Sequence, residues 1–133
     1  MTDDRFECGM VVRRQVLGNE HVDRATAAAT DLTADFQRLI TGYAWGEIWT
    51  RPGLDRRIRS CITVAMLVAL NRPEELELHL RAAATNGVSR AEIKEVLLQA
   101  AIYCGVPAAN SAFAIAQRVL GKADAGQQPP ADR

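Results

Sequence analysis

The feature that most constrains the fold is an apolar run at residues 61–70, which reads Cys-Ile-Thr-Val-Ala-Met-Leu-Val-Ala-Leu and holds no charged side chain. From Asp55 to Leu70 the chain also lacks glycine and proline, and so long a stretch without a turn signal favours a helix over a strand. A helix that is apolar on every side has to be buried on every side. The sequence therefore predicts a central, buried helix that begins at its N-cap Asp55 and ends before Asn71-Arg72-Pro73.

Helical periodicity and helix-terminus signals predict further helices on both sides of the central one. Three precede it: residues 5–17, ended by Gly18; an alanine-rich segment at residues 23–29; and a helix capped by Thr30 or Asp31, with Leu32, Phe36, Leu39, Ile40 and Tyr43 at helical spacing. Three follow it: residues 73–86, opened by Pro73 and ended by Gly87; a helix opened by the capping box Ser89-Arg-Ala-Glu92; and a helix that restarts at Pro107 after Gly105 and reaches Gly121.

No segment alternates with period two, so the predicted fold is all-α, with five to seven helices and no internal repeat. Residues 1–120 are enough to bury one core and are predicted to form a single domain. Residues 121–133 are small, polar and proline-containing, a composition typical of a disordered tail.

Charge and cysteine content argue against several classes of partner. Basic and acidic residues both number 16, so the formal net charge is zero, which argues against nucleic acid or an anionic membrane surface as a partner. Cys8, Cys61 and Cys104 form no CxxC pair and no Cys/His spacing, which predicts neither a disulfide nor a metal site. We expect them to be reduced, buried thiols of a cytoplasmic protein. The N-terminus has no hydrophobic signal region, and the apolar run is far shorter than a membrane span.

Residues 43–61 concentrate groups that can recognise an acid. They include both tryptophans, one glutamate and four of the fourteen arginines, namely Arg51, Arg56, Arg57 and Arg59. Three of these arginines lie in the first turn of the predicted central helix, where the helix dipole makes each cation unfavourable by a few tenths to ~1 kcal/mol unless an anion compensates it. Asp55, Glu47 or a bound acid could provide that anion. Two interpretations stay open: recognition of a carboxylate by guanidinium groups, and solvated charges at a helix end.

Two residues are candidates for proton transfer. Glu47 lies between Trp45 and Trp49, and a carboxylate that loses solvation beside indoles suits acid–base work; the alternative is an ordinary i,i+4 ion pair with Arg51. His79 falls beside the inward stripe that positions 76, 80 and 83 form on their helix. It is either a structural histidine of the core or a catalytic one, whereas His21 is expected in a loop.

The residues also resemble a known family. The segments that carry the resemblance are Gly46-Glu-Ile-Trp-Thr-Arg-Pro-Gly-Leu-Asp-Arg-Arg-Ile-Arg-Ser60, Glu75-Leu-Glu-Leu-His79, Ile93-Lys-Glu-Val96 and Ile102-Tyr-Cys-Gly-Val-Pro-Ala-Ala-Asn-Ser-Ala112. From about Arg5 to Leu120 the chain resembles the carboxymuconolactone decarboxylase family, which is similar in fold to the alkylhydroperoxidase-D group of all-α trimers and hexamers. That group's redox motif is absent, because Pro107, Asn110 and Ala114 occupy the positions of its two cysteines and histidine. Reduction of peroxides by a dithiol is therefore not expected.

The resemblance implies conversion of 4-carboxymuconolactone to 3-oxoadipate enol-lactone and carbon dioxide, in the β-ketoadipate pathway of protocatechuate breakdown. The substrate is a dicarboxylate lactone whose carbonyl accepts the electrons released with carbon dioxide, so neither a cofactor nor a metal is expected. By the resemblance, His79 donates the proton with the help of Glu47, and substrate-binding residues are Arg51, Arg56, Arg57, Arg59, Trp45, Trp49, Glu95, Tyr103 and Asn110. A homo-oligomer, trimer or hexamer, is implied as well. The alternative is a non-catalytic oligomerisation or ligand-binding module of the same fold.

Overall fold

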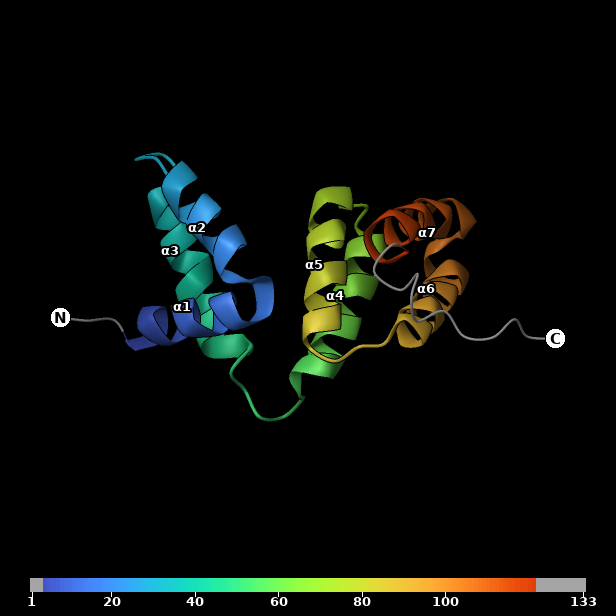
Figure 1. The fold of residues 1–133 in the computed structure, drawn as a ribbon, viewed down its shortest axis with the longest axis horizontal. Helices are drawn as coiled ribbons and strands as arrows, with labels where there is room; N and C mark the ends of the chain where they lie inside the picture. The colour runs from blue at the N-terminus through green and yellow to red at the C-terminus, as the bar shows by residue number, and fades with distance from the viewer. Residues whose placement is uncertain (1–3, 122–133) are drawn as a thin grey trace. The chain divides into compact units, whose positions relative to one another are not determined.

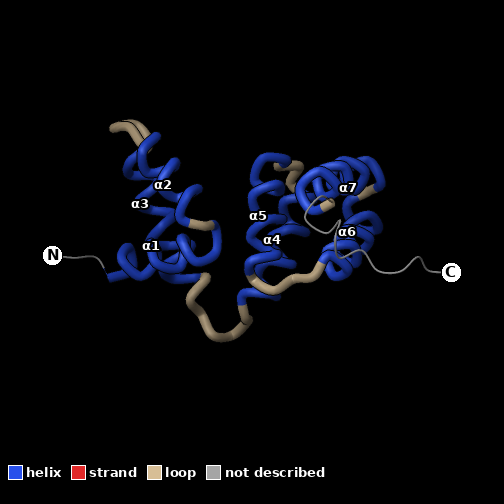
Figure 2. Tube along the Cα trace, viewed as in Figure 1, coloured by secondary structure: helices blue, strands red, loops and turns tan. Residues whose placement is uncertain are grey.

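The computed structural model describes residues 4–121, and within them the backbone is helical with connecting turns and no β-strand (Figure 1). Figure 2 shows this all-helical content along the chain. The elements are α1 (Asp4–Leu17), α2 (Asn19–Ala28), α3 (Ala34–Ile40), the π-helix η1 (Thr41–Ile48), α4 (Arg56–Ala69), α5 (Pro73–Thr85), α6 (Arg90–Cys104) and α7 (Val106–Leu120). The all-α prediction is confirmed, with seven α-helices in the described residues.

The chain divides into two compact units between Arg59 and Ser60, within α4. We describe each unit by itself, and one domain over residues 1–120 stays a prediction. Apart from Gly121, the predicted tail lies outside the described residues.

The N-terminal unit is held together by a close approach of α1 to η1. A Cβ atom on Gly9 would fall on the carbonyl oxygen of Thr41, and one on Gly46 would fall on the carbonyl oxygen of Arg5. Only glycine permits backbones to approach this closely. Around this contact Val12, Val16, Val22 and Trp45 are buried and form the apolar interior of the unit.

The π-helix was not predicted from the sequence. Thr41–Ile48 continues α3 without a break, and the amide of Trp49 donates to the carbonyl of Ala44, five residues earlier, at 2.9 Å. π-Helical turns are rare and carry no recognised sequence signature, which is why periodicity did not reveal this one.

The C-terminal unit packs α5, α6 and α7 with the second half of α4 around one apolar cluster. Figure 1 shows α4 and α5 side by side, and Val64 and Val68 of α4 belong to the same cluster as Leu76 and Leu80 of α5. The cluster also contains Ala83 of α5, Val88 of the turn before α6, and residues of α6 and α7: Ile93, Leu97, Ala100, Ala112 and Ala116. In the same unit, the buried Ser60 hydroxyl of α4 accepts a 2.9 Å hydrogen bond from Asn86 Nδ2 at the end of α5.

Helix-terminus predictions are confirmed in this unit. Pro73 opens α5, and Ser89 and Glu92 form the predicted capping box at the start of α6. Gly87 and Gly105 have φ angles of 88° and 101°. These left-handed values suit glycine, and Gly105 allows α7 to follow α6 after a single residue.

The central helix is not buried on every side, so that prediction is wrong for the single chain. Ser60, Val64 and Val68 of α4 are buried, but four residues on another face, spaced four apart, are 38–64% exposed: Ile58, Ile62, Met66 and Leu70. The apolar sequence of this helix indicates that its surface is unfavourable in water. The sequence alone does not show whether the same chain or another one covers that surface.

Three smaller predictions are also wrong. His21 lies inside α2 and is half-buried, not in a loop. Helix α3 begins after Thr33, later than expected, and the predicted apolar positions Leu32, Phe36, Leu39 and Tyr43 are exposed. The three cysteines form no disulfide, but Cys8 is exposed, while Cys61 and Cys104 are half-buried against the C-terminal core. No helix among residues 4–121 combines the length and the apolar character that crossing a membrane requires.

Candidate functional site

The two tryptophans of the candidate site lie against each other at the end of η1. Trp45 and Trp49 stack with ring centroids 4.9 Å apart and planes inclined at 27°. Trp45 is buried and Trp49 is half-buried. The pair therefore forms an apolar wall whose inner member belongs to the core of the N-terminal unit.

Glu47 is exposed. Its carboxylate forms an ion pair with Arg5 at 3.7 Å, and 46% of its side chain is exposed. The expected loss of solvation at Glu47 is wrong for this structure, because so much of the side chain is in contact with water. The alternative prediction, an ion pair of Glu47 with Arg51, is also wrong, because Glu47 pairs with Arg5 of α1.

Asp55 lies at the N-terminus of α4. Its Oδ1 accepts a 2.9 Å hydrogen bond from the backbone amide of Ile58, which confirms Asp55 as the N-cap. Arg59 Nη2 donates to the carbonyl oxygen of Arg51 at 3.1 Å, which ties the first turn of α4 to the preceding loop. Arg56, Arg57 and Arg59 are half-buried and Arg51 is exposed. Residues 51–59 thus carry four arginines, three of them in the first turn of a helix whose N-terminus favours anions.

His79 lies on α5 in the C-terminal unit, beside the core stripe predicted for that helix. Leu76, Leu80 and Ala83 are buried as expected, and His79 is half-buried with its Nδ1 atom inside the protein. Glu77 lies two residues before His79 on the same helix. Its carboxylate oxygens form ion pairs with Arg81 at 2.9 Å and with Arg118 of α7 at 2.8 Å. His79 is therefore carried by a helix that is anchored to its neighbour by packing and by ion pairs.

The remaining predicted residues lie on other helices than His79. Glu95 and Tyr103 lie on α6 and Asn110 lies on α7, and all three are exposed, Tyr103 to 81%. Within residues 4–121 none of the three forms a hydrogen bond or ion pair with His79. Their grouping stays a prediction.

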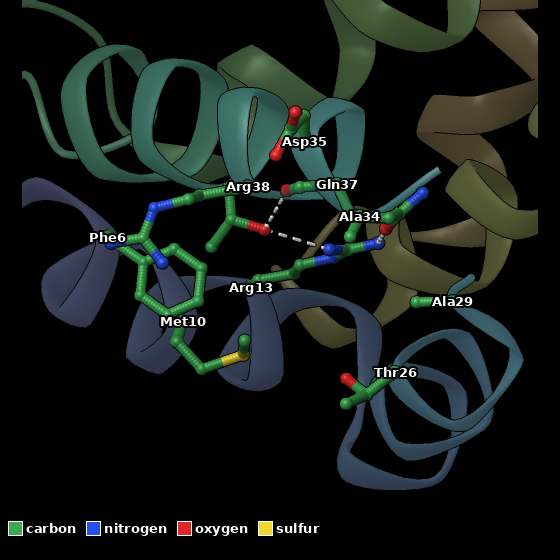
Figure 3. A pocket seen from close by; sticks show the side chains of 10 residues that line it. Phe6, Met10, Arg13, Thr26, Ala29, Ala34, Asp35, Gln37 and Arg38 are labelled. Carbon is green, nitrogen blue, oxygen red and sulfur yellow. Dashed lines mark hydrogen bonds between the residues drawn. The ribbon is translucent and has the colours of Figure 1, made fainter. Parts of the chain in front are cut away.

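Sequence reasoning missed a pocket of about 340 Å³ in the N-terminal unit, between α1, α2 and α3 (Figure 3). Arg13 of α1 lines it and is only 7% exposed. Burial lowers the pKa of Arg13 from its usual value. The local sequence Val-Val-Arg-Arg gave no sign of this, because Arg13 and Arg14 look alike in a weakly amphipathic helix.

Neutral groups hold the Arg13 guanidinium. Nη1 donates to Thr41 Oγ1 at 2.9 Å and Nη2 donates to Gln37 Oε1 at 3.1 Å. The Thr41 hydroxyl in turn donates to the Gln37 carbonyl at 2.7 Å, so its oxygen is oriented as an acceptor toward Arg13. No group of three or more His, Cys, Asp or Glu side chains in the described residues is placed to hold a metal ion.

Comparison with known proteins adds a family and several relatives. The sequence profile of the carboxymuconolactone decarboxylase family matches residues 34–118. The chain is 46% identical over 118 residues to 4-carboxymuconolactone decarboxylase of Acinetobacter baylyi, covering 89% of this chain and 88% of that one. It is 44% identical over 115 residues to nitrosuccinic acid decarboxylase of Metarhizium robertsii, covering 86% of this chain and 80% of the relative. A shorter match, 46% over 43 residues, joins 32% of the chain to 90% of a 4-carboxymuconolactone decarboxylase sequence of Pseudomonas putida.

Proposed function

The chain belongs to the carboxymuconolactone decarboxylase family, and on this premise we propose that it is a carboxy-lyase that converts 4-carboxymuconolactone to 3-oxoadipate enol-lactone and carbon dioxide. The observation that carries the proposal is the 46% identity, over 89% of the chain, to a relative of that name. The place of the reaction is the β-ketoadipate pathway of protocatechuate breakdown, in the cytoplasm.

A second substrate deserves an assay because the 44% identity to nitrosuccinic acid decarboxylase is nearly as high. Nitrosuccinate and 4-carboxymuconolactone share two features: each carries two carboxylates, and each contains its own electron acceptor, a nitro group or an unsaturated lactone. What the two reactions have in common is the loss of one carboxylate from a dianion. We give priority to the lactone because the higher identity and the wider coverage favour it.

The chemistry needs three things from the protein. The bond between the ring carbon and the carboxylate breaks, and its electron pair passes through the ring double bond to the lactone carbonyl, giving a dienolate. A proton then adds to the α-carbon and gives the enol-lactone. The protein has to bind two carboxylates, stabilise negative charge on the lactone oxygen and supply that proton. The lactone is the electron sink, so the proposal requires no cofactor.

The residues at the start of α4 suit the first two tasks. Arg51, Arg56, Arg57 and Arg59 provide guanidinium groups that bind carboxylates in a bidentate manner. We assign the two carboxylates and the dienolate oxygen to this group, with Trp45 and Trp49 as apolar walls. The support for this assignment is the concentration of four arginines in residues 51–59, at and just before a helix N-terminus that favours anions.

His79 is the proposed proton donor, because an imidazole can exchange a proton near neutral pH and its helix is firmly anchored. In this proposal Glu47 sets the charge of the site or relays the proton. Glu95, Tyr103 and Asn110 complete the substrate contacts.

We also propose a homo-oligomer, trimer or hexamer, of subunits with the alkylhydroperoxidase-D type of fold. Its support is the apolar surface that the single chain leaves in water. Besides the α4 face already described, Ile102, Tyr103 and Val106 at the junction of α6 and α7 are 72–81% exposed. Light scattering coupled to size-exclusion chromatography measures the subunit number directly.

One assay tests the catalytic proposal against a non-catalytic module. The purified protein is incubated with 4-carboxymuconolactone, and in parallel with nitrosuccinate, without added cofactor, while carbon dioxide and the organic product are followed. Turnover of the lactone supports the proposal. Turnover of nitrosuccinate alone reassigns the substrate, and no turnover of either by folded protein favours a binding or oligomerisation role.

A further inference from the structure

We propose that the pocket between α1, α2 and α3 binds the carboxylate of a small organic acid with an apolar body, and that Arg13 is the cation that receives it (Figure 3). This site is separate from the decarboxylase residues proposed above and does not depend on that function. Helices α1 and α2 precede residue 34, where the family match begins.

The first argument is the unbalanced charge of Arg13. Its side chain lines the pocket, the residue is only 7% exposed, and both of its hydrogen-bond acceptors, Thr41 Oγ1 and Gln37 Oε1, are neutral. Its Nε atom is buried and has no hydrogen-bond partner in residues 4–121. A buried cation is costly unless an anion accompanies it, so the guanidinium has both the charge and a spare donor for a carboxylate.

The second argument is that the protein's own carboxylate in the pocket is not used. Asp35 lines the pocket, but it is exposed and forms no ion pair with Arg13 in the described chain. Arg38, also at the pocket, lies 4.6 Å from the centre of the Phe6 ring and adds a second cation. Counting Arg13, Arg38 and Asp35, the pocket carries one excess positive charge.

The third argument concerns the kind of acid. Phe6, Met10, Ala29 and Ala34 contribute apolar surface to the pocket, and its volume of about 340 Å³ lies at the small end of ligand sites. An apolar or aromatic body would contact these side chains while its carboxylate meets Arg13. Phosphate or sulfate would leave the apolar part unfilled, which is why the assignment is to an organic acid.

The test uses benzoate as the probe and benzamide, which has the same shape without the charge, as its control. Isothermal titration calorimetry of the full chain should detect benzoate binding and no benzamide binding. Arg13→Met should weaken benzoate binding by about tenfold or more. Gln37→Glu should also weaken benzoate binding while leaving Arg13 in place. The Gln37 side-chain oxygen lies 3.1 Å from the guanidinium, so a glutamate there would form an ion pair with Arg13 and compete with benzoate. This second variant keeps the test decisive if Arg13→Met does not fold.

Two control variants separate this pocket from other arginines. Arg24→Met removes an exposed cation that is already paired with Glu20 at 2.8 Å, and it should leave benzoate affinity unchanged. Arg59→Met should leave it unchanged as well, because Arg59 does not line this pocket. Absence of benzoate binding to the wild-type protein, equal binding of benzamide, unchanged affinity in Gln37→Glu, or loss of affinity in Arg59→Met would each overturn the proposal.

Discussion

Arg59 Nη2 lies 3.1 Å from the backbone carbonyl oxygen of Arg51 and donates a hydrogen bond to it. One side chain thus fixes the loop that enters α4 with one N–H of a planar, multi-donor guanidinium. A lysine at this position cannot reproduce that geometry, because its ammonium is a single point of charge.

We therefore expect Arg59→Lys to raise the KM for 4-carboxymuconolactone by about tenfold, with a smaller effect on kcat. Steady-state kinetics with carbon dioxide detection measures both constants. Arg24→Lys is the matched control, because Arg24 is exposed and forms its ion pair with Glu20, one turn away on the same helix. An unchanged KM in Arg59→Lys would assign the carboxylates to the other arginines of the stretch.

His79→Ala should fold and lose most of its turnover. Half-buried beside the core, His79 contributes packing that alanine reduces only in part, whereas a missing general acid lowers kcat by about 10²–10⁴-fold. Circular dichroism checks the fold, and single-turnover kinetics measures the chemical step. His21→Ala changes the other histidine and should leave turnover near the wild-type value. Near wild-type turnover in His79→Ala would remove His79 from the mechanism.

The parts of the fold that the sequence predicted are those with local causes. Asp55, the Ser89 capping box, Gly87 and Gly105 act through the backbone within a few residues, so their signals are visible without tertiary contacts. The stripe of Leu76, Leu80 and Ala83 was also predicted, since a helix with one apolar face has one way to bury it.

The parts that were missed have non-local causes. The burial of Arg13 depends on Thr41 and Gln37, which are 28 and 24 residues away along the chain. The ion pair of Glu47 with Arg5 depends on the close approach of α1 to η1 at Gly46, which has no periodic signature. Proximity in the sequence had placed Glu47 between two indoles that in fact contact each other.

His21 should make the protein less stable in mild acid. Burial lowers its pKa in the folded state below the usual 6.5, and the charges of Arg13 and Arg24 lower it further. As the pH falls through 6.5, the unfolded chain takes up the proton first, so the free energy of unfolding decreases until the pH reaches the folded-state pKa. The contribution of neutral His21 to the free energy of unfolding is therefore fully present above pH 6.5, and it is lost as the pH falls below that value toward the folded-state pKa.

His21→Gln removes this titration. Urea unfolding at about pH 7.5 and about pH 5 should show a smaller loss of stability in the variant than in the wild-type protein. The two pH values lie on either side of 6.5, the usual pKa of histidine, and the other acid-sensitive groups are common to both proteins. Equal losses would show that His21 does not couple to folding.

Gly9→Ala should be among the most destabilising single-methyl changes in the N-terminal unit. The added Cβ would fall on the carbonyl oxygen of Thr41, and both groups belong to helix backbones that cannot shift separately. We expect a loss of about 3 kcal/mol or more in the free energy of unfolding.

Gly53→Ala is the matched control, because no atom lies within 4 Å of its would-be Cβ. Alanine there should raise stability by about 0.5 kcal/mol through the unfolded chain. Urea denaturation of the two variants distinguishes a steric contact from a general effect of replacing glycine, and equal shifts would contradict the close approach of α1 to η1.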